Sequence, residues 1–357
     1  MPKWGYVFLV FIIIGLVATV VAFFVIRANP FKKSDTQKTE VSSGLAGIFV
    51  SEDGGASWVA LKGSAGLKPL SFAFRAGEAR HLYVGTKGSG LWIRKNGKDV
   101  LERVEDPSGV LSQDADIYAI AQTPAGDVLY LGVLQNRRGR LLRLTEKGAE
   151  EIYETALEEY PVLAVYVDPN DPLHINFIAE GAFYEARDGG KSKSWEPLAR
   201  IKDGFIKLAA SADGKELFAL DGKNTLFVTT SGGRSWREAS PIAVEKSKIK
   251  RVHDFQYDAK RNALVVASDF GLLETQNSGE SWTMFRTPVP PNTLPITAFG
   301  AHPRFSEVMW MAAGRLIYRS DDGGITWSSV EIPSQKNVGL LVVSPSNPKE
   351  VYAGISE

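Results

Sequence analysis

One eight-residue phrase recurs along the chain and constrains its fold more than any other feature. It reads SEDGGASW at residues 51–58 and SDDGGITW at residues 320–327. Further copies, TTSGGRSW and TQNSGESW, occupy residues 229–236 and 275–282, and a fifth copy with two extra residues ends in DGGKSKSW at residues 188–195. A turn that recurs at a fixed period is the signature of a repeat architecture, in which every copy marks one supersecondary unit.

The residues of this phrase suit a tight turn between two strands. Asp or Asn accepts hydrogen bonds from nearby backbone N–H groups, and glycine supplies the positive φ that such turns require. The Ser or Thr hydroxyl ties the turn to itself, and the tryptophan buries a large ring. Because the same residues recur wherever the turn recurs, we interpret them as structural rather than catalytic or metal-binding. They are Ser51, Asp53, Gly55, Trp58, Asp188, Gly190, Trp195, Thr229, Ser231, Gly233, Trp236, Thr275, Asn277, Gly279, Trp282, Ser320, Asp322, Gly324 and Trp327.

The repeat units predict an all-β, seven-bladed β-propeller of four-stranded antiparallel blades. Six units begin near Leu70, Asp116, Pro161, Asp203, Lys248 and Asn292, an interval of about one four-stranded blade. The first two units keep a turn but lack the phrase. A seventh unit starts near Val338 and ends after two strands, whereas the N-terminal part of the repeat region supplies a third and a fourth strand. Both termini are therefore expected to complete one blade, which removes open sheet edges.

The N-terminal region predicts a membrane anchor. Residues 4–26 carry no charge, and 23 helical residues extend roughly 34 Å, enough to cross a bilayer. A cleaved signal peptide is the alternative, but its apolar core is usually about 7–15 residues long and precedes a small-residue cleavage site. We therefore divide the chain into an anchor at 1–26, a polar tether at 27–45 and the propeller at 46–357, with the lipid bilayer contacted through residues 4–26.

Composition excludes several classes of function. The chain has 41 basic and 41 acidic residues, a balance that argues against a broad nucleic-acid-binding surface. It has no cysteine, which excludes disulfides, thiol catalysis and a lipoprotein anchor. Its four histidines are scattered and show no metal-binding spacing. We expect no metal and no cofactor.

The strand order predicts two faces with different roles. The recurrent turns join third and fourth strands and share one face with the first-to-second turns, while the opposite face carries the second-to-third loops and the connections between blades. Propellers usually bind ligands on this second face. Arg137, Arg138 and Arg140 in the second unit and Arg315 in the sixth are the candidate partner-binding residues. Arginines there suit a carboxylate, a phosphate or an acidic loop, and a solvated hairpin tip is the alternative interpretation.

The recurrent phrase resembles the Asp-box, or BNR, signature Ser/Thr-x-Asp-x-Gly-x-Ser/Thr-Trp of β-propeller blades. The repeat region is similar to the photosystem II stability/assembly-factor family and, more distantly, to sortilin- and sialidase-type propellers. The first resemblance implies a non-catalytic propeller that binds membrane-protein intermediates through an arginine-rich patch, for which Arg137, Arg138 and Arg140 are the candidate counterpart. A sialidase would need an early Arg-Ile-Pro motif, whereas the nearest string here is Phe285–Pro288.

We therefore expect a membrane-anchored, non-enzymatic propeller that binds a membrane protein or membrane complex, as an assembly factor or accessory subunit. Carbohydrate or cell-envelope binding, or sialidase-like glycoside hydrolysis, is the alternative. The excess of Lys and Arg after the apolar segment would place the propeller in the cytoplasm. Anchored relatives usually face outward, so the expectation is a single-pass cytoplasmic (inner) membrane protein with an extracytoplasmic propeller.

Overall fold

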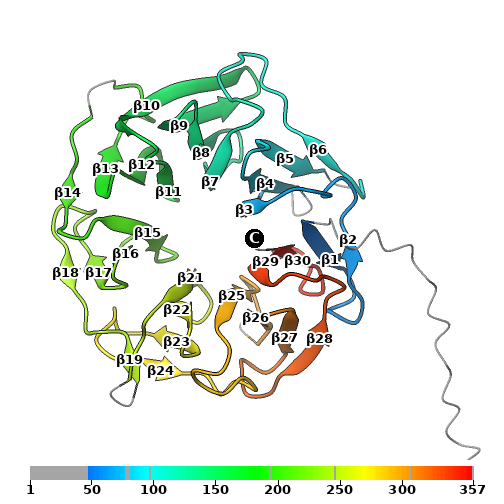
Figure 1. Cartoon of the computed structure of the whole chain (residues 1–357). Helices are drawn as coiled ribbons and strands as arrows, with labels where there is room; N and C mark the ends of the chain where they lie inside the picture. The colour runs from blue at the N-terminus through cyan, green and yellow to red at the C-terminus, as the bar shows by residue number, and fades with distance from the viewer. Residues whose placement is uncertain are drawn as a thin grey trace, which may run out of the picture. The chain divides into compact units, whose positions relative to one another are not determined.

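The inner strands of seven sheets surround a central axis in the computed structural model of the chain (Figure 1). The structure describes residues 47–76, 81–95, 98–192, 195–244, 247–305 and 307–355, all within the unit Ser43–Glu357. Each of the seven sheets has four antiparallel strands, and consecutive strands run from the axis outward. The predicted seven-bladed propeller is confirmed.

The blades follow one another around the axis in chain order. The first three are β3 (Pro69–Phe74), β4 (Leu82–Thr86), β5 (Leu91–Arg94) and β6 (Leu101–Arg103); β7 (Asp116–Gln122), β8 (Leu129–Gln135), β9 (Arg138–Thr145) and β10 (Gly148–Glu158); and β11 (Val162–Asp168), β12 (Asp171–Ala179), β13 (Ala182–Ala186) and β14 (Ala199–Arg200). The next three are β15 (Phe205–Ala210), β16 (Leu217–Asp221), β17 (Leu226–Thr229) and β18 (Arg237–Glu238); β21 (Val252–Asp258), β22 (Ala263–Ser268), β23 (Leu272–Thr275) and β24 (Thr283–Met284); and β25 (Ile296–Ala301), β26 (Met309–Ala313), β27 (Leu316–Ser320) and β28 (Ser328–Glu331).

The last blade is assembled from both ends of the described chain. Strands β29 (Val338–Val343) and β30 (Val351–Ile355) form its inner half, and β1 (Ile48–Ser51) and β2 (Val59–Ala60) form its outer half. β1 pairs antiparallel with β30, with Ile48 opposite Gly354 and Ser51 opposite Val351. The ring therefore closes as the sequence predicts.

The core lies between blades rather than inside any one of them. The second strands of the first, fourth, fifth, sixth and last blades are buried at every residue, because each has sheet partners on both sides and a neighbouring blade against each face. Aromatic rings bridge these interfaces. Phe183 of the third blade meets Trp236 of the fourth at 5.2 Å, and Trp58 meets Trp310 edge-on at 6.3 Å. Each unit therefore depends on its neighbours for burial of its apolar surface.

Every inner strand carries a β-bulge close to its first residue. The register with the second strand shifts at this point in all seven blades, so that one residue is left without a partner. We call these residues the bulge ring: Leu70, Tyr118, Leu163, Ile206, His253, Thr297 and Gly339. The sequence pattern does not predict these bulges.

The fifth unit departs from its predicted start. A short hairpin, β19 (Ala243–Val244) and β20 (Ser247–Lys248), is inserted ahead of it. Ser247 and Lys248 pair back onto β19, and the inner strand begins at Val252, four residues after the predicted start near Lys248; the inner strand of the sixth blade, at Ile296, likewise begins four residues after the predicted start near Asn292.

The predicted anchor at 1–26 and tether at 27–45 lie outside the described residues. Within the described part of the chain, no helix has the length and apolar character needed to cross a membrane.

Candidate partner-binding face

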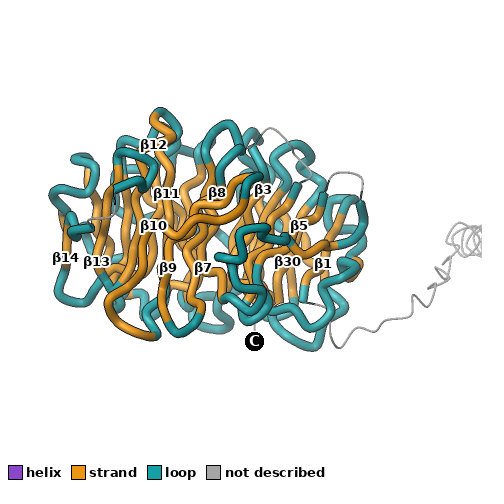
Figure 2. The backbone as a smooth tube through the Cα atoms, turned by 90° about the horizontal axis from the view of Figure 1, so that it is seen from above, coloured by secondary structure: helices purple, strands orange, loops and turns teal. Residues whose placement is uncertain are grey.

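The ring has two faces of loops, which Figure 2 shows edge-on with the strands running between them. The recurrent turns join third to fourth strands, as between β1 and β2 or between β27 and β28, and we call their side the box face. The opposite side carries the second-to-third loops and the links between blades, and we call it the connection face. Because Ile48 pairs with Gly354, β1 begins and β30 ends on the connection face.

On the box face, the recurrent carboxylates form hydrogen bonds within their own turns. Asp53 accepts hydrogen bonds from the Ser57 amide at 2.9 Å and the Ser57 hydroxyl at 2.6 Å. The Ser51 hydroxyl donates to Asp53 at 2.8 Å and accepts from the Gly55 amide at 2.7 Å. Asp322 has equivalent partners, and the side chain and amide of Thr326 lower the pKa of Asp322 to about 2. These groups hold the turn and are not directed at a ligand.

The variant copies keep the same geometry with other donors and acceptors. Ser231 accepts from the Ser235 amide at 3.0 Å, as Asn277 does from the Ser281 amide at 3.0 Å. In the longer copy, Asp188 accepts from the amide and hydroxyl of Ser192 at 2.8 and 2.5 Å. From Asp188 to Ser192, this turn therefore has the same size as in the other copies.

Two of the five tryptophans, Trp195 and Trp327, donate a hydrogen bond to the blade before their turn, whereas the indole N–H groups of Trp58, Trp236 and Trp282 are buried without a hydrogen-bond partner among the described residues. The Trp195 indole N–H donates to the Ile152 carbonyl at 2.8 Å, and that of Trp327 donates to the Arg286 carbonyl at 3.0 Å. In both cases the acceptor lies in the preceding blade, so the turn fixes how two neighbouring blades stack.

A buried charge cluster on the box face joins the first blade to the last. Arg94 of β5 contacts Glu350 at 2.8 Å and Glu52 at 2.8 Å, and its guanidinium lies 5.4 Å from the centre of the Tyr352 ring. The Tyr352 hydroxyl donates to Glu350 at 2.6 Å. Only 7% of the Arg94 side chain and 2% of the Glu350 side chain are exposed, so this cluster is part of the interior.

Among the described residues, no group of three or more His, Asp or Glu side chains is arranged to hold a metal ion. His174 lies between two carboxylates, with its Nδ1 3.3 Å from Asp168 and its Nε2 2.9 Å from Glu185. His302 accepts from the amides of Arg304 and Phe305 in its turn. These two imidazoles are held by local contacts.

The candidate arginines of the second blade lie on the connection face, each held by the strand beside it. Arg137 occupies the tight turn before β9 at a φ of 64° and contacts Glu158 at 2.7 Å and Glu159 at 2.9 Å. Arg138 donates to the Thr155 carbonyl at 3.1 Å.

Arg140 contacts Glu151 at 2.9 Å and Glu154 at 2.8 Å, since the antiparallel register of β9 and β10 places arginines opposite glutamates. The cluster is thus a charge-compensated hairpin, in which the side chain of Arg137 is the most exposed of the ion-paired arginines at 69%.

Arg315 does not join this cluster. It lies at the loop before β27 in the sixth blade, where it contacts Glu331 at 2.7 Å, whereas the other three arginines belong to the second blade. The structure therefore brings together three of the four candidate arginines.

The connection face also contains two cavities that sequence reasoning missed. The larger has a volume of about 370 Å³ and lies where the inner strands of the first, second and last blades meet. We call it the axial cavity. It is lined by Lys68, Pro69, Leu70, Lys87, Tyr118, Gly339, Leu340 and Ile355. Three of these residues, Leu70, Tyr118 and Gly339, belong to the bulge ring. The sequence pattern predicts neither the bulges nor the cavity beside them.

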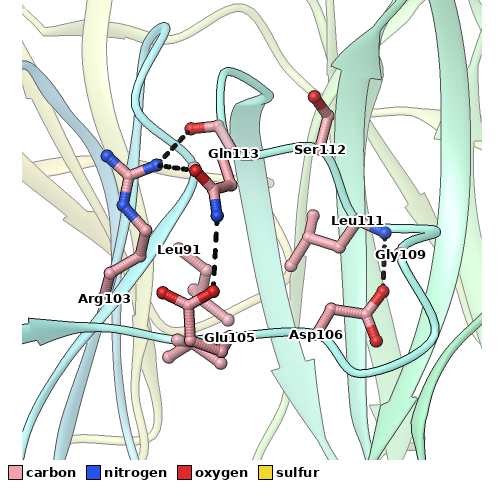
Figure 3. A pocket seen from close by; sticks show the side chains of 10 residues that line it. Leu91, Arg103, Glu105, Asp106, Gly109, Leu111, Ser112 and Gln113 are labelled. Carbon is pink, nitrogen blue, oxygen red and sulfur yellow. Dashed lines mark hydrogen bonds between the residues drawn. The ribbon is translucent and has the colours of Figure 1, made fainter.

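The second cavity, about 250 Å³, lies beside the link between the first and second blades (Figure 3). The polar side chains that line it form hydrogen bonds with one another. The Arg103 guanidinium donates to the Gln113 backbone carbonyl at 2.9 Å, and the side-chain amide of Gln113 donates to the Glu105 carboxylate at 3.3 Å. Asp106 accepts from the amides of Val110 and Leu111, both at 2.8 Å.

Burial would raise the pKa of Asp106, but the hydrogen bonds from Leu111, Ser108 and Ala149 outweigh it and lower the pKa to about 2. These groups hold the link between the blades in place.

No family model and no curated protein sequence gives a significant match to the chain. Solved structures do match. YCF48 bound to a D1 peptide is 17% identical, with a TM-score of 0.61 over 82% of this chain and 93% of that one. YCF48 from Cyanidioschyzon merolae is 15% identical, with a TM-score of 0.60 over 81% of this chain and 95% of that one. At these identities the match shows a shared propeller fold.

The same fold occurs in enzymes. The GH74 xyloglucanase from Xanthomonas campestris is 15% identical, with a TM-score of 0.64 over 86% of this chain and 52% of that one. The chain therefore spans about half the length of this enzyme. Since the fold accommodates both a peptide-binding protein and a glycoside hydrolase, the fold alone does not decide whether this chain is an enzyme.

Proposed function

We propose that this chain is a non-catalytic propeller that binds a protein partner through its connection face. The observation that carries the proposal is the axial cavity, a mixed apolar and basic hollow on the face opposite the recurrent turns. On the box face, the recurrent polar groups form the internal hydrogen bonds of their turns. A YCF48 propeller of the same fold has been solved with a D1 peptide bound, which supports a protein segment as the ligand.

The proposal includes a membrane setting, for which the uncharged segment at residues 4–26 is the support. The propeller begins and ends on the connection face, so a tether of about 20 residues, up to roughly 70 Å when extended, permits this face to reach a membrane protein. The partner is then a membrane protein or complex, and the chain serves as its assembly factor or accessory subunit. We further propose that the propeller lies outside the cytoplasm.

The likeness to a GH74 xyloglucanase favours carbohydrate binding or hydrolysis as the second candidate. Hydrolysis would need two carboxylates facing one open site. Sugar binding would favour exposed aromatic rings: Tyr160, in the link between the second and third blades, is exposed, whereas the half-buried Trp92 near the connection face is already engaged. Its N–H donates to the Ser89 carbonyl at 2.8 Å, and the Arg103 guanidinium lies 5.0 Å from the ring centre. We therefore rank this candidate second.

Affinity purification of the tagged full-length protein from its native membranes, in mild detergent with light crosslinking, tests the proposal. The expected result is a stoichiometric membrane-protein partner that is lost from the double variant Arg137→Glu and Arg138→Glu. The matched control is Lys191→Glu with Lys349→Glu, because both lysines are exposed on the box face and the charge change is equal. A clean preparation without a partner would contradict the proposal and direct attention to glycan arrays.

The orientation has its own test. Protease treatment of spheroplasts should degrade the propeller if it lies outside the cytoplasm, whereas a protected propeller would place it inside. A cytoplasmic reporter provides the control for membrane integrity.

A further inference from the structure

The axial cavity lies beside one irregular position in the bulge ring. Six of the seven bulge residues carry a side chain, whereas the last blade has Gly339 at this position. Gly339 lies next to Leu340 in the wall of the cavity, together with Leu70 and Tyr118 from the neighbouring bulges. The hollow thus lies at the point where the repeat is interrupted, beside the blade that both ends of the propeller complete.

One part of the cavity wall is apolar. Pro69, Leu70, Leu340 and Ile355 line it, and Ile355 is buried. A volume of about 370 Å³ falls near the lower end of ligand sites and corresponds to roughly a dozen water molecules. It therefore accommodates one or two large apolar side chains of a ligand.

The other part of the wall carries two lysines from one edge. The Lys87 amide donates to the Lys68 carbonyl at 2.8 Å, so the two side chains start from paired positions at the ends of β3 and β4. Both lysines take part in interactions within the chain, and a ligand carboxylate would exchange with those. The propeller from residue 47 onward has 36 basic and 39 acidic residues, so this paired positive charge is a local feature.

Tyr118 completes the polar part of the wall. Burial and the neighbouring Asp116 raise the pKa of Tyr118, while Lys87 acts in the opposite direction. The phenol therefore stays protonated at neutral pH, and its hydroxyl is hydrogen-bonded to the Asp116 side chain. Asp116 is itself engaged by the Gly88 amide at 2.7 Å. The ammonium groups of Lys68 and Lys87 are therefore the part of the wall that suits an acidic ligand, which would compete with their present partners.

We infer that the axial cavity is a recognition site for an extended acidic and apolar segment of the partner protein. An apolar side chain of that segment enters between Leu70, Leu340 and Ile355, and a neighbouring Asp or Glu side chain binds Lys68 and Lys87. The apolar wall explains why an inorganic anion would be a poor ligand, and the small volume disfavours a long acyl chain. This inference rests on the proposed protein-binding function.

Fluorescence anisotropy with the full-length protein in detergent tests this site. The probe is a fluorescein-labelled, amidated octapeptide with Asp-Leu-Glu-Phe at its centre, compared with a peptide carrying Asn-Leu-Gln-Phe and one carrying Asp-Ser-Glu-Ser. The expected result is that the first peptide binds at least tenfold more tightly than either of the others. Equal binding of all three peptides would overturn the inference.

Variants of the protein locate the site. Lys68→Gln with Lys87→Gln removes both charges and leaves polar side chains one atom shorter, and we expect it to weaken binding of the first peptide at least tenfold. The control, Lys202→Gln with Lys250→Gln, removes the same charge from exposed positions of the connection face and should leave binding unchanged. Thermal unfolding of each variant shows whether a loss of binding reflects a loss of folding. If a variant unfolds, a measurement on the wild-type protein takes its place: chemical labelling of the Lys68 and Lys87 amines, with and without free peptide. Equal labelling in both samples would contradict the site.

Two outcomes separate this inference from the proposed function. If the partner purified from membranes still binds the Lys68 and Lys87 variant but not the Arg137 and Arg138 variant, the function holds and the cavity is not its site. If sodium decanoate displaces the probe with the same lysine dependence and binds more tightly than the peptide, the cavity is a lipid site and the inference is wrong. Loss of the partner from both variants is the result expected.

Discussion

The two faces of the ring use polar residues in opposite ways. On the box face, Asp53 and Asp322 make the same hydrogen bonds in blades far apart in the sequence, and Arg94 is buried with Glu350. On the connection face, the bulge residues differ from blade to blade, and their one glycine lies beside a cavity. The comparison teaches that recurrence marks the scaffold, whereas the positions that break the repeat are the place to look for function.

The largest predicted effect concerns the buried cluster of the box face. Arg94→Met should lower the free energy of unfolding by about 3–5 kcal/mol, because it leaves the Glu350 carboxylate buried without its cation. Urea unfolding followed by circular dichroism measures this. The double variant Arg94→Met with Glu350→Gln should recover part of the lost stability. A loss below about 1 kcal/mol for Arg94→Met would show that this cluster does not stabilise the fold.

A pair of glycine variants compares the two faces directly. A Cβ at Gly233 of the box face, where φ is 90°, would lie 2.1 Å from the buried Phe183 ring, so Gly233→Ala should cost about 3 kcal/mol. A Cβ at Gly88 of the connection face, where φ is 69°, meets no atom within 4 Å. Gly88→Ala should therefore cost only the backbone term of about 1–2 kcal/mol. Equal shifts in thermal unfolding would contradict the difference between the faces.

Asp106 offers a pH test of a link on the connection face. Asp106→Asn should cost about 1–2 kcal/mol near neutral pH, because the carboxylate accepts several amide hydrogen bonds. The pKa of Asp106 is about 2 in the folded chain against 3.8 ordinarily. Its stabilising contribution is therefore complete above about pH 4 and is lost as the pH falls toward 2.

Denaturant unfolding of both proteins at about pH 6 and pH 3 measures this contribution of Asp106. The difference in unfolding free energy between wild type and variant should shrink at the lower pH. A difference that is constant with pH would exclude the charge as its source.

The smallest effect on stability is expected for the hairpin arginines, the exposed Arg137 and the half-buried Arg138. Arg137→Glu with Arg138→Glu should change the free energy of unfolding by no more than about 1 kcal/mol, because exposed ion pairs such as Arg137 with Glu158 contribute little. Thermal unfolding checks this expectation. A larger loss would mean that the hairpin belongs to the scaffold and that partner loss in this variant reports unfolding.

The number of blades and the closure of the ring were predictable because both depend on the period of the sequence. Two strands after Val338 and two strands from Ile48 onward complete one blade only when they pair, as β30 and β1 do. The hairpin β19–β20 was missed, since it interrupts the period without a recurrent residue to mark it.

The candidate site was less predictable because it depends on register. The sequence shows the arginines near Arg140, but their glutamate partners become evident only when β9 and β10 are aligned residue by residue. Likewise, Lys68 and Gly339 lie at opposite ends of the propeller sequence, and only closure of the ring brings them to one cavity. The anchor and the tether stay predictions.

The pairing of Ile48 with Gly354 sets an order of events during protein synthesis. Strand β1 leaves the ribosome before any other strand of the propeller, yet its partner β30 is the last strand to be made. Until β30 has been made, β1 has an unpaired edge, which is the kind of surface that chaperones shield from aggregation. Such a distant contact also slows folding, because the two ends must meet before either is stabilised. A ring that lacked β30 would therefore have two open edges.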